Sequence, residues 1–398
     1  MSRAPVVVLA PDSFKGSLTA AQVRRALAEG LRSVRPAVRV VEAAVADGGE
    51  GTVAAVLEHG WQPISATVPG PWGDPVPATW AWQPDTSTAV VELAAASGIA
   101  LDPELVPSRP ADGPARALTA STRGVGELVR SALDHGCRRI VLGLGGSATN
   151  DGGAGMLAAL GVRLVGTDGR PVQGGVHWLE SVAEVDLSGL DARLADTEVV
   201  LANDVDNPLL GERGAAAVFA PQKGADEPTV DRIEAALTRW AHLLDSALGR
   251  ADSPSGAAAG ASPAAAPGAG AAGGTGYAVL AALRATQVAG ADLLLNLVGI
   301  DAALDGADLV VTGEGRLDEQ TLSGKAPLGV LVRARAHGIR VVGVTGHCDL
   351  PPEVAREAGF TAVHALTDLE PDVQRCLADP VPLLRLIGRG LADYVTER

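Results

Sequence analysis

The chain has 398 residues, 47% of them hydrophobic and 20% charged, with a formal net charge of −15 at pH 7. These numbers are typical of a globular protein of two domains, and the negative charge argues against nucleic acid or an anionic membrane as a partner. No stretch has the apolar length of a membrane span or a secretory signal, and three scattered cysteines are too few for a disulfide framework, so we expect a cytoplasmic protein.

A short β-branched run that ends in a loop of glycine and small polar residues, followed by a helical pattern, recurs along the chain. It occurs in "VVVLAPDSFKGS", "RRIVLGLGGSATNDGG", "TEVVLANDVDNP", "ADLVVTGEGRLDEQ" and "IRVVGVTGH". Such runs are typical of strands buried on both faces of a parallel sheet, with helices such as "SLTAAQVRRALAEGLRSV" and "STRGVGELVRSALDHG" covering it. The alternation predicts an α/β fold whose ligand site lies at the carboxyl ends of the strands, where these loops are.

Two stretches have a different character. Residues 61–90 hold four of the six tryptophans and alternate like an antiparallel sheet, which indicates the start of a second lobe. Residues 250–268, "RADSPSGAAAGASPAAAPG", are of low complexity and predict a flexible tether or surface excursion rather than core.

Two loops near the N-terminus carry groups suited to phosphate chemistry. In "APDSFKGSLTAAQV", Ser17 or Thr19 can cap the next helix, and Lys15 adds a positive charge beside backbone N–H groups that bind anions. In "VADGGEGT", the carboxylates of Asp47 and Glu50 can hold Mg²⁺ or accept a hydroxyl proton. A simple capped turn and a tight loop with solvated acids are the alternative interpretations of these two motifs.

The longest glycine-rich stretch after a predicted strand is "GLGGSATNDGGAGM", residues 143–156. Successive backbone N–H groups in such loops form nests for phosphate oxygens, so we predict phosphate binding here. The spacing does not match the dinucleotide fingerprint, which argues against a dinucleotide-dependent oxidoreductase. Further along, Asn203 and Asp204 in "ANDVDNPLLG" can ligate a metal or a small polar substrate, although an Asx-turn would explain them equally well.

The stretch "VVTGEGRLDEQTLSGKAP", residues 310–327, gathers charges of both signs directly after a predicted strand. Its cations, carboxylates and glycines are the types that phosphoryl transfer needs for phosphate, Mg²⁺ and the acceptor hydroxyl. The chain has only three lysines, Lys15, Lys223 and Lys325, each beside a glycine, while the other 29 basic residues are arginine. A lysine kept in such a chain indicates a position where a planar guanidinium cannot replace a compact ammonium.

Together and in this order, seven motifs resemble those of the bacterial glycerate kinase family over nearly the whole chain. They are "APDSFKGS", "VADGGEGT", "GLGGSATNDGGAG", "ANDVDNPLLG", "FAPQKGA", "GAGAAGG" and "TGEGRLDEQTLSGKAP". The resemblance implies ATP-dependent, Mg²⁺-dependent phosphorylation of D-glycerate, with 2-phosphoglycerate favoured over 3-phosphoglycerate. It also implies two α/β lobes around a cleft: a flavodoxin-like parallel-sheet domain from residues 1–60 and 285–398, and an inserted mixed-sheet domain from residues 61–284.

The resemblance also assigns expected roles to residues of these motifs. The catalytic set is Lys15, Asp47, Asp204, Glu314, Arg316, Asp318 and Lys325. The set expected to bind ATP is Gly145, Gly146, Ser147, Thr149, Asn150, Asp151, Gly273 and Gly274. The set expected to bind glycerate is Asp12, Ser13, Asn203 and Lys223, and the expected metal ligands are Asp204 and Asp318. The general base stays open among Asp47, Asp204 and Asp318.

The sequence departs from the family pattern in two places. The segment before "GAGAAGG" carries "SPSGAAAGASPAAAP" where the family is compact, and Arg123 stands where the family usually has tyrosine or serine. The alternative function is a non-catalytic sugar-acid-binding sensor on the same fold, which the lysines and acids kept in the loops disfavour. We expect a monomer or a homodimer.

Overall fold

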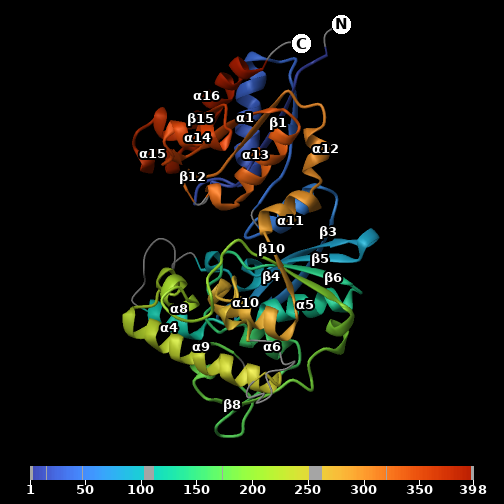
Figure 1. The fold of residues 1–398 in the computed structure, drawn as a ribbon, viewed down its shortest axis with the longest axis vertical. Coiled ribbons are helices and arrows are strands. Elements are labelled where there is room, and N and C mark those ends of the chain that lie inside the picture. The colour runs from blue at the N-terminus through green and yellow to red at the C-terminus, as the bar shows by residue number, and fades with distance from the viewer. Residues whose placement is uncertain are drawn as a thin grey trace. The chain divides into compact units, whose positions relative to one another are not determined.

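The computed structural model describes residues 3–14, 16–46, 48–102, 112–172, 174–250, 262–319 and 321–395. The chain forms two compact units, of which unit 1 comprises Met1–Asp47, Ala54–His59 and Ala289–Arg398, and unit 2 comprises Gly48–Val53 and Gly60–Val288. In Figure 1, unit 1 is therefore drawn mainly in dark blue, orange and red, because both ends of the chain contribute to it.

In the residues that the structure describes, unit 1 is built on a five-stranded parallel sheet with the order β2-β1-β11-β13-β15. These strands are β1 (Val6–Pro11), β2 (Arg39–Glu42), β11 (Leu309–Gly313), β13 (Arg340–Thr345) and β15 (Ala362–Ala365). Counted along this unit, the order is 2-1-3-4-5, the flavodoxin-like order. The three runs predicted as buried strands at the two ends of the chain are confirmed as β1, β11 and β13, and the structure adds β2 and β15 at the edges of the sheet.

Helices cover both faces of this sheet. On one face α1 (Ala20–Val34) and α16 (Pro380–Gly390) pack together over an apolar cluster that includes Val7, Leu9 and Val311. The opposite face is covered by α13 (Ala326–Ala336), against which α11 (Gly290–Leu297) and α12 (Ile300–Leu304) pack. Of the two caps predicted for α1, Thr19 is the one used, in a capping box with Gln22. The other elements of unit 1 are β12 (Arg316–Leu317), β14 (His347–Cys348), α14 (Pro352–Ala358) and α15 (Val373–Ala378).

Unit 2 contains, among the described residues, a six-stranded mixed sheet with the order β3-β4-β5-β6-β9-β10. The strands are β3 (Gln62–Pro69), β4 (Pro75–Gln83), β5 (Thr88–Glu92), β6 (Arg139–Gly143), β9 (Glu198–Ala202) and β10 (Thr286–Val288). β3 and β4 pair antiparallel, as do β4 and β5, which confirms the antiparallel arrangement predicted over residues 61–90. β5, β6, β9 and β10 are parallel to one another.

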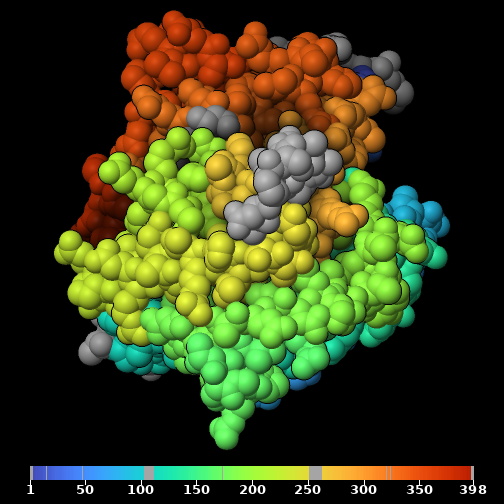
Figure 2. All heavy atoms as spheres, turned by 60° about the horizontal axis from the view of Figure 1, so that its bottom comes forward, coloured from blue at the N-terminus to red at the C-terminus, as the bar shows by residue number. Residues whose placement is uncertain are grey.

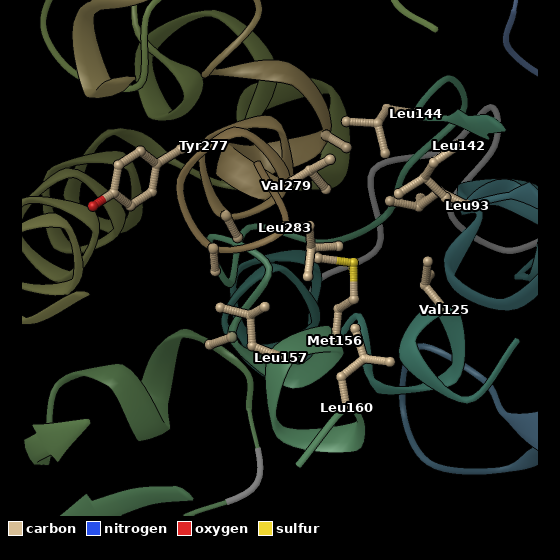
Figure 3. Packing of buried hydrophobic residues seen from close by; sticks show 14 of the residues in the cluster. Leu93, Val125, Leu142, Leu144, Met156, Leu157, Leu160, Tyr277, Val279 and Leu283 are labelled. Atoms are coloured by element: carbon tan, nitrogen blue, oxygen red, sulfur yellow. The ribbon is translucent and has the colours of Figure 1, made fainter. Parts of the chain in front are cut away.

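The helices of unit 2 enclose a large apolar core, part of which Figure 3 shows. The longest helix described there is α9 (Glu227–Ala247), the yellow band across the surface in Figure 2. Tyr277 of α10 (Ala271–Ala282) turns its hydroxyl away from the leucines labelled in Figure 3 and donates it to the Ala241 carbonyl of α9 at 3.0 Å. The other elements are α2 (Thr52–Glu58), which runs on into unit 1, α3 (Ala94–Ser97), α4 (Gly113–Thr119), α5 (Arg123–Asp134), α6 (Ala154–Ala159), α7 (Val176–Leu179), α8 (Ala215–Phe219), β7 (Arg163–Gly166) and β8 (Val182–Asp186).

The predicted fold class is confirmed: a parallel sheet built from both ends of the chain and an inserted unit with a mixed sheet. Much of the low-complexity stretch, residues 251–261, lies outside the described residues. Its last part is hydrogen-bonded, since Ser262 caps the short turn Pro263–Ala265 and the Leu209 N–H donates to the Ala264 carbonyl at 2.8 Å. None of the helices within the described ranges has the length and apolar character needed to cross a membrane.

Candidate active site

A cavity of about 320 Å³ opens in unit 1 where β1, β11, β13 and β15 end. The loops that line it, which include Ser13, Glu314, His347 and Thr367, each follow the carboxyl end of one of these strands. Between β1 and β11 the order of the sheet reverses, and in open α/β sheets ligands bind at this reversal. The predicted location of the site at the strand ends therefore coincides with a real cavity.

The charged part of the cavity contains Glu314, Asp318 and Lys325, all from the loop after β11. The Lys325 ammonium lies 3.4 Å from Glu314 Oε2, and the side chain of this lysine is 28% exposed. Lys325 is also the N-cap residue of α13, so its charge adds to the positive end of the dipole of an 11-residue helix. Pro327 has no N–H, and the Leu328 N–H donates to the Lys325 carbonyl at 3.0 Å, so the lysine itself supplies most of the positive charge at this helix start. This arrangement is suited to an anionic group such as a phosphate or a carboxylate.

Thr321 links the two carboxylates of this loop that line the cavity. Its buried hydroxyl donates to Glu314 Oε1 at 2.7 Å and accepts the backbone N–H of Asp318 at 3.1 Å. The Thr321 N–H in turn donates to Asp318 Oδ1 at 3.1 Å. Sequence reasoning missed Thr321, because a threonine in a charged loop carries no signal that distinguishes it from a solvated residue.

Arg316 is engaged with a partner that the sequence did not suggest. Its Nε lies 2.5 Å from Asp349 Oδ2, and His347 Nε2 lies 3.1 Å from Asp349 Oδ1. The short parallel pair β12–β14 brings these residues together. Hydrogen bonding from the Arg316 guanidinium holds the pKa of Asp349 below its usual value. Arg316 and His347 both line the cavity, so this ion pair forms part of its rim.

The loop after β1 contributes the first motif. Asp12 is buried, its N–H donates to the Gly313 carbonyl at 2.8 Å, and its Oδ1 accepts the Ser13 N–H at 2.6 Å. Asp12 thus ties the end of β1 to the end of β11, while Ser13 lines the cavity. Lys15 and Asp47, both predicted to be catalytic, lie outside the described residues.

In unit 2 the glycine-rich loop after β6 packs against the "GGEG" loop. A Cβ atom on Gly143 would lie 2.2 Å from the Gly48 carbonyl oxygen, and one on Gly145 would lie 2.5 Å from the Gly49 Cα. A Cβ on Gly273 would likewise lie 2.0 Å from the Thr149 carbonyl oxygen. Glycine is required at these positions because protein backbone approaches protein backbone.

The polar side chains of the same loop point inward. Thr149, Asn150 and Asp151 have no exposed surface, and Ser147 is 9% exposed. The Asp151 carboxylate accepts hydrogen bonds from the backbone N–H and hydroxyl of Thr122 at 2.9–3.1 Å, and from the N–H groups of Gly153 and Gly155 at 3.2 Å. These bonds fix the shape of the loop at the start of α6.

Lys223 is buried beside this loop. It is 2% exposed, and its ammonium donates to the Thr149 carbonyl at 2.6 Å. Burial lowers the pKa of Lys223 to about 7, against the attraction of Asp151, and burial raises the pKa of Asp151. The sequence singled out Lys223 for its scarcity, and the structure places it inside the protein rather than at a surface.

A second buried carboxyl, Glu92 at the end of β5, anchors the "GGEG" loop. It is 8% exposed and receives the backbone N–H groups of Gly51, Thr52 and Val53. Burial raises its pKa to about 7 despite these donors. Sequence reasoning missed Glu92 because it ends a strand with no glycine-rich loop after it.

The remaining predicted residues lie in unit 2. Both side-chain amide atoms of Asn203 bond to the backbone of Val205, at 3.0 and 3.3 Å, which is the Asx-turn considered from the sequence. Asp204 beside it is exposed, as is Gly146, whereas Gly274 is buried. In the part of the chain that the structure describes, no three His, Cys, Asp or Glu side chains gather as a ready-made metal cage.

Comparison with known proteins gives a match of the whole chain. The model of the glycerate kinase family matches residues 7–396. This chain belongs to that family. The glycerate kinase of Bacillus subtilis is 41% identical over 361 residues, 90% of this chain and 90% of its own, and the glycerate 2-kinase of Escherichia coli K12 is 39% identical with the same coverage. A crystal structure assigned as glycerate kinase 2 of Salmonella typhimurium LT2 superposes with a TM-score of 0.77 at 38% identity, covering 98% of both chains.

Family membership confirms the resemblance seen in the motifs. At one of the two departures from the family pattern, Arg123 begins α5, and its Nε pairs with Glu127 one turn later at 3.3 Å. Arg123 therefore has a local partner on its own helix.

Proposed function

We propose that this protein catalyses phosphoryl transfer from ATP to a hydroxyl group of D-glycerate, with 2-phosphoglycerate as the favoured product. The observation that carries the proposal is the cavity at the strand reversal of unit 1, lined by Lys325, Glu314 and Asp318. A phosphoryl group in transfer spreads negative charge over its oxygens, and a lysine at a helix N-terminus stabilises such charge.

In this proposal Lys325 faces the transferring phosphoryl group or the glycerate carboxylate, and Glu314 holds its ammonium in position. Asp318 is the candidate in unit 1 for orienting the acceptor hydroxyl or holding Mg²⁺. Mg²⁺ is commonly bound by one or two carboxylates together with substrate phosphates, so the carboxylates of this cavity fit it without a cage made by protein alone. When bound, Mg²⁺ would neutralise charge on the phosphates.

Asp204, the other predicted metal ligand, lies in unit 2. We propose it separately, as a Mg²⁺ ligand or as the general base. Asp47 stays a third candidate for the base. The glycine loop of unit 2 acts on a ligand, in this proposal, through exposed backbone near Gly146 rather than through the buried side chains of Thr149, Asn150 and Asp151.

The test is a coupled assay of ADP release with D-glycerate, with L-glycerate as the stereochemical control. Product identity follows from NMR, because phosphorus at C2 couples to one proton and phosphorus at C3 couples to the two protons of a methylene group. Steady ADP release that depends on D-glycerate supports the proposal. Tight D-glycerate binding with no ADP release would instead identify the non-catalytic sensor.

A further inference from the structure

The cavity of unit 1 is lined by two groups of residues of opposite chemistry, which we call its charged end and its apolar end. One end carries the charged groups Glu314, Asp318 and Lys325. The other end is apolar, and its lining consists mainly of Phe14, Leu366, Val373, Cys376 and Leu377.

Two members of the apolar end are large side chains left open to solvent. Val373 is 46% exposed and Leu377 is 43% exposed, and both line the cavity. They stand four residues apart on α15, so they lie on one face of the helix. Exposed apolar groups that line a concave site mark a surface for a ligand.

Val373 and Leu377 form an apolar wall of the cavity, and this wall is held in place before any ligand binds. Asp372 caps α15 by accepting the N–H groups of Gln374 and Arg375, at 2.9 and 3.4 Å. The Cys376 thiol donates to the Glu370 carbonyl at 3.1 Å. The orientation of Val373 and Leu377 toward the cavity is thus fixed by the loop and the helix.

The substrates of the proposed reaction differ in what they can offer such a wall. Each of the three carbons of D-glycerate bears oxygen, so this acid has no apolar face to bury. A purine ring has two flat apolar faces. The cavity of about 320 Å³ is also within the range of ~300–1,000 Å³ found for sites of larger small molecules.

We propose that the apolar end of this cavity binds the adenine ring of the nucleotide, in contact with Val373 and Leu377, with the phosphates directed toward Lys325. This inference rests on the proposed function for the identity of the nucleotide. It assigns to α15, a segment that the sequence motifs did not single out, the role of a base-binding wall.

Two hydroxyl groups that line the cavity, those of Thr367 and Ser17, are already bonded within the protein. Thr367 Oγ1 is 3.2 Å from His347 Nδ1, and Ser17 Oγ donates to the Leu377 carbonyl at 3.3 Å. The apolar wall therefore contacts the flat faces of the base and makes no hydrogen bonds to the polar atoms along its edge. We expect GTP and ATP to bind with affinities within about tenfold of each other, since no buried polar group would be left unpaired by either base.

Calorimetric titration of the full-length protein with ADP, in the absence of glycerate, tests the inference. Leu377→Ser is compared with Leu386→Ser, which changes a leucine of similar exposure (50%) on α16 that does not line the cavity. We expect Leu377→Ser to weaken ADP binding by about tenfold, because most of one apolar contact is lost, and Leu386→Ser to leave it within twofold.

The outcomes separate this inference from the proposed function. ADP affinity that is unchanged in Leu377→Ser overturns the base site, and so does a loss confined to D-glycerate binding. A change of oligomeric state in Leu377→Ser with normal ADP binding would make this face a subunit interface. If the wild-type protein binds ADP in the expected way but does not phosphorylate D-glycerate, the base site stands and the proposed function fails. If it binds no adenine nucleotide, both fail.

Discussion

The loops that follow β11 and β6 look alike in the sequence and differ in the structure. Both come directly after a buried strand, and both mix glycine with acidic and hydroxyl side chains. After β11, the side chains of Glu314, Asp318 and Lys325 line a cavity. After β6, the side chains of Thr149 and Asp151 are buried and bond or pack inside the protein.

The difference shows that a glycine-rich polar loop after a strand has two separate uses. Where glycines allow backbone to approach backbone, as at Gly145 and Gly49, the polar side chains are buried, and Asp151 completes internal hydrogen bonds. Where the loop opens at a strand reversal, they remain accessible to a ligand. Substitutions in the first kind of loop should cost stability, and substitutions in the second should cost catalysis.

The largest expected effect concerns Lys325, the accessible lysine of the described residues. Lys325→Ala should lower kcat/KM by about a hundredfold or more, the usual cost of losing one donor to the transition state. Lys325→Arg should also lose most activity, because a planar guanidinium cannot take the place of a compact ammonium beside Glu314. Steady-state kinetics with ATP and D-glycerate measure both.

Urea unfolding of the same variants provides the control. Lys325 is partly exposed and paired at 3.4 Å, so its removal should change the free energy of unfolding by less than about 1 kcal/mol. A near-normal kcat for Lys325→Arg at saturating substrates would show that the scarcity of lysine in this chain carries no functional signal.

The next effect concerns Lys223, the buried lysine, and appears in stability rather than in catalysis. Burial lowers its pKa to about 7 from an ordinary value of 10.5. Between pH 7 and pH 10.5 the unfolded chain binds a proton at Lys223 that the folded protein does not bind. The stability of the folded state therefore rises with pH in this range. From pH 7 to pH 9 this contribution should increase the free energy of unfolding by about 2 kcal/mol.

Urea unfolding of the wild type and of Lys223→Met at pH 7, 8 and 9 isolates that contribution. Methionine has a similar length and no charge, and Glu92 and the other titrating groups are common to both proteins. The wild type should gain stability relative to Lys223→Met as pH rises. Parallel pH curves for the two proteins would mean that Lys223 is protonated to a similar extent in the folded and unfolded states. Lys223 would then not differ from Lys325 by a pH-dependent effect on stability.

Much of the fold was predictable because its signals are local. β-branched runs such as that of β1 and β11 indicate buried parallel strands, and the alternation over residues 61–90 indicates the antiparallel part of unit 2. The motifs also predicted a loop suited to phosphate chemistry after β11, and in the structure this loop lines a cavity. These features depend on residues close together in the sequence.

What was not predictable depends on contacts between distant residues. Glu92 meets the N–H of Val53 39 positions away, and Lys223 meets Thr149 at a separation of 74. Burial of a polar residue follows from such packing, so the sequence could not show that Asp151 lies inside the protein. The apolar wall of α15 was missed for a related reason: Val373 and Leu377 have the spacing of an ordinary core helix, and only the structure shows them exposed.

The smallest effect concerns Thr321. Its side chain is buried, like those of the loop after β6, but it bonds to Glu314, which lines the cavity. Thr321→Val keeps the shape of the side chain and removes the hydroxyl that donates to Glu314 at 2.7 Å. We expect kcat to fall by about tenfold, with KM for ATP little changed, since a hydroxyl that positions Glu314 and also accepts the Asp318 N–H contributes about as much as one hydrogen bond to a charged group. Thr321→Ser restores the hydroxyl and should recover most of kcat. If serine is as damaging as valine, the methyl group matters and the hydroxyl does not position Glu314. If valine lowers the free energy of unfolding and leaves kcat normal, the loop after β11 behaves like the loop after β6, and the distinction between them disappears at this residue.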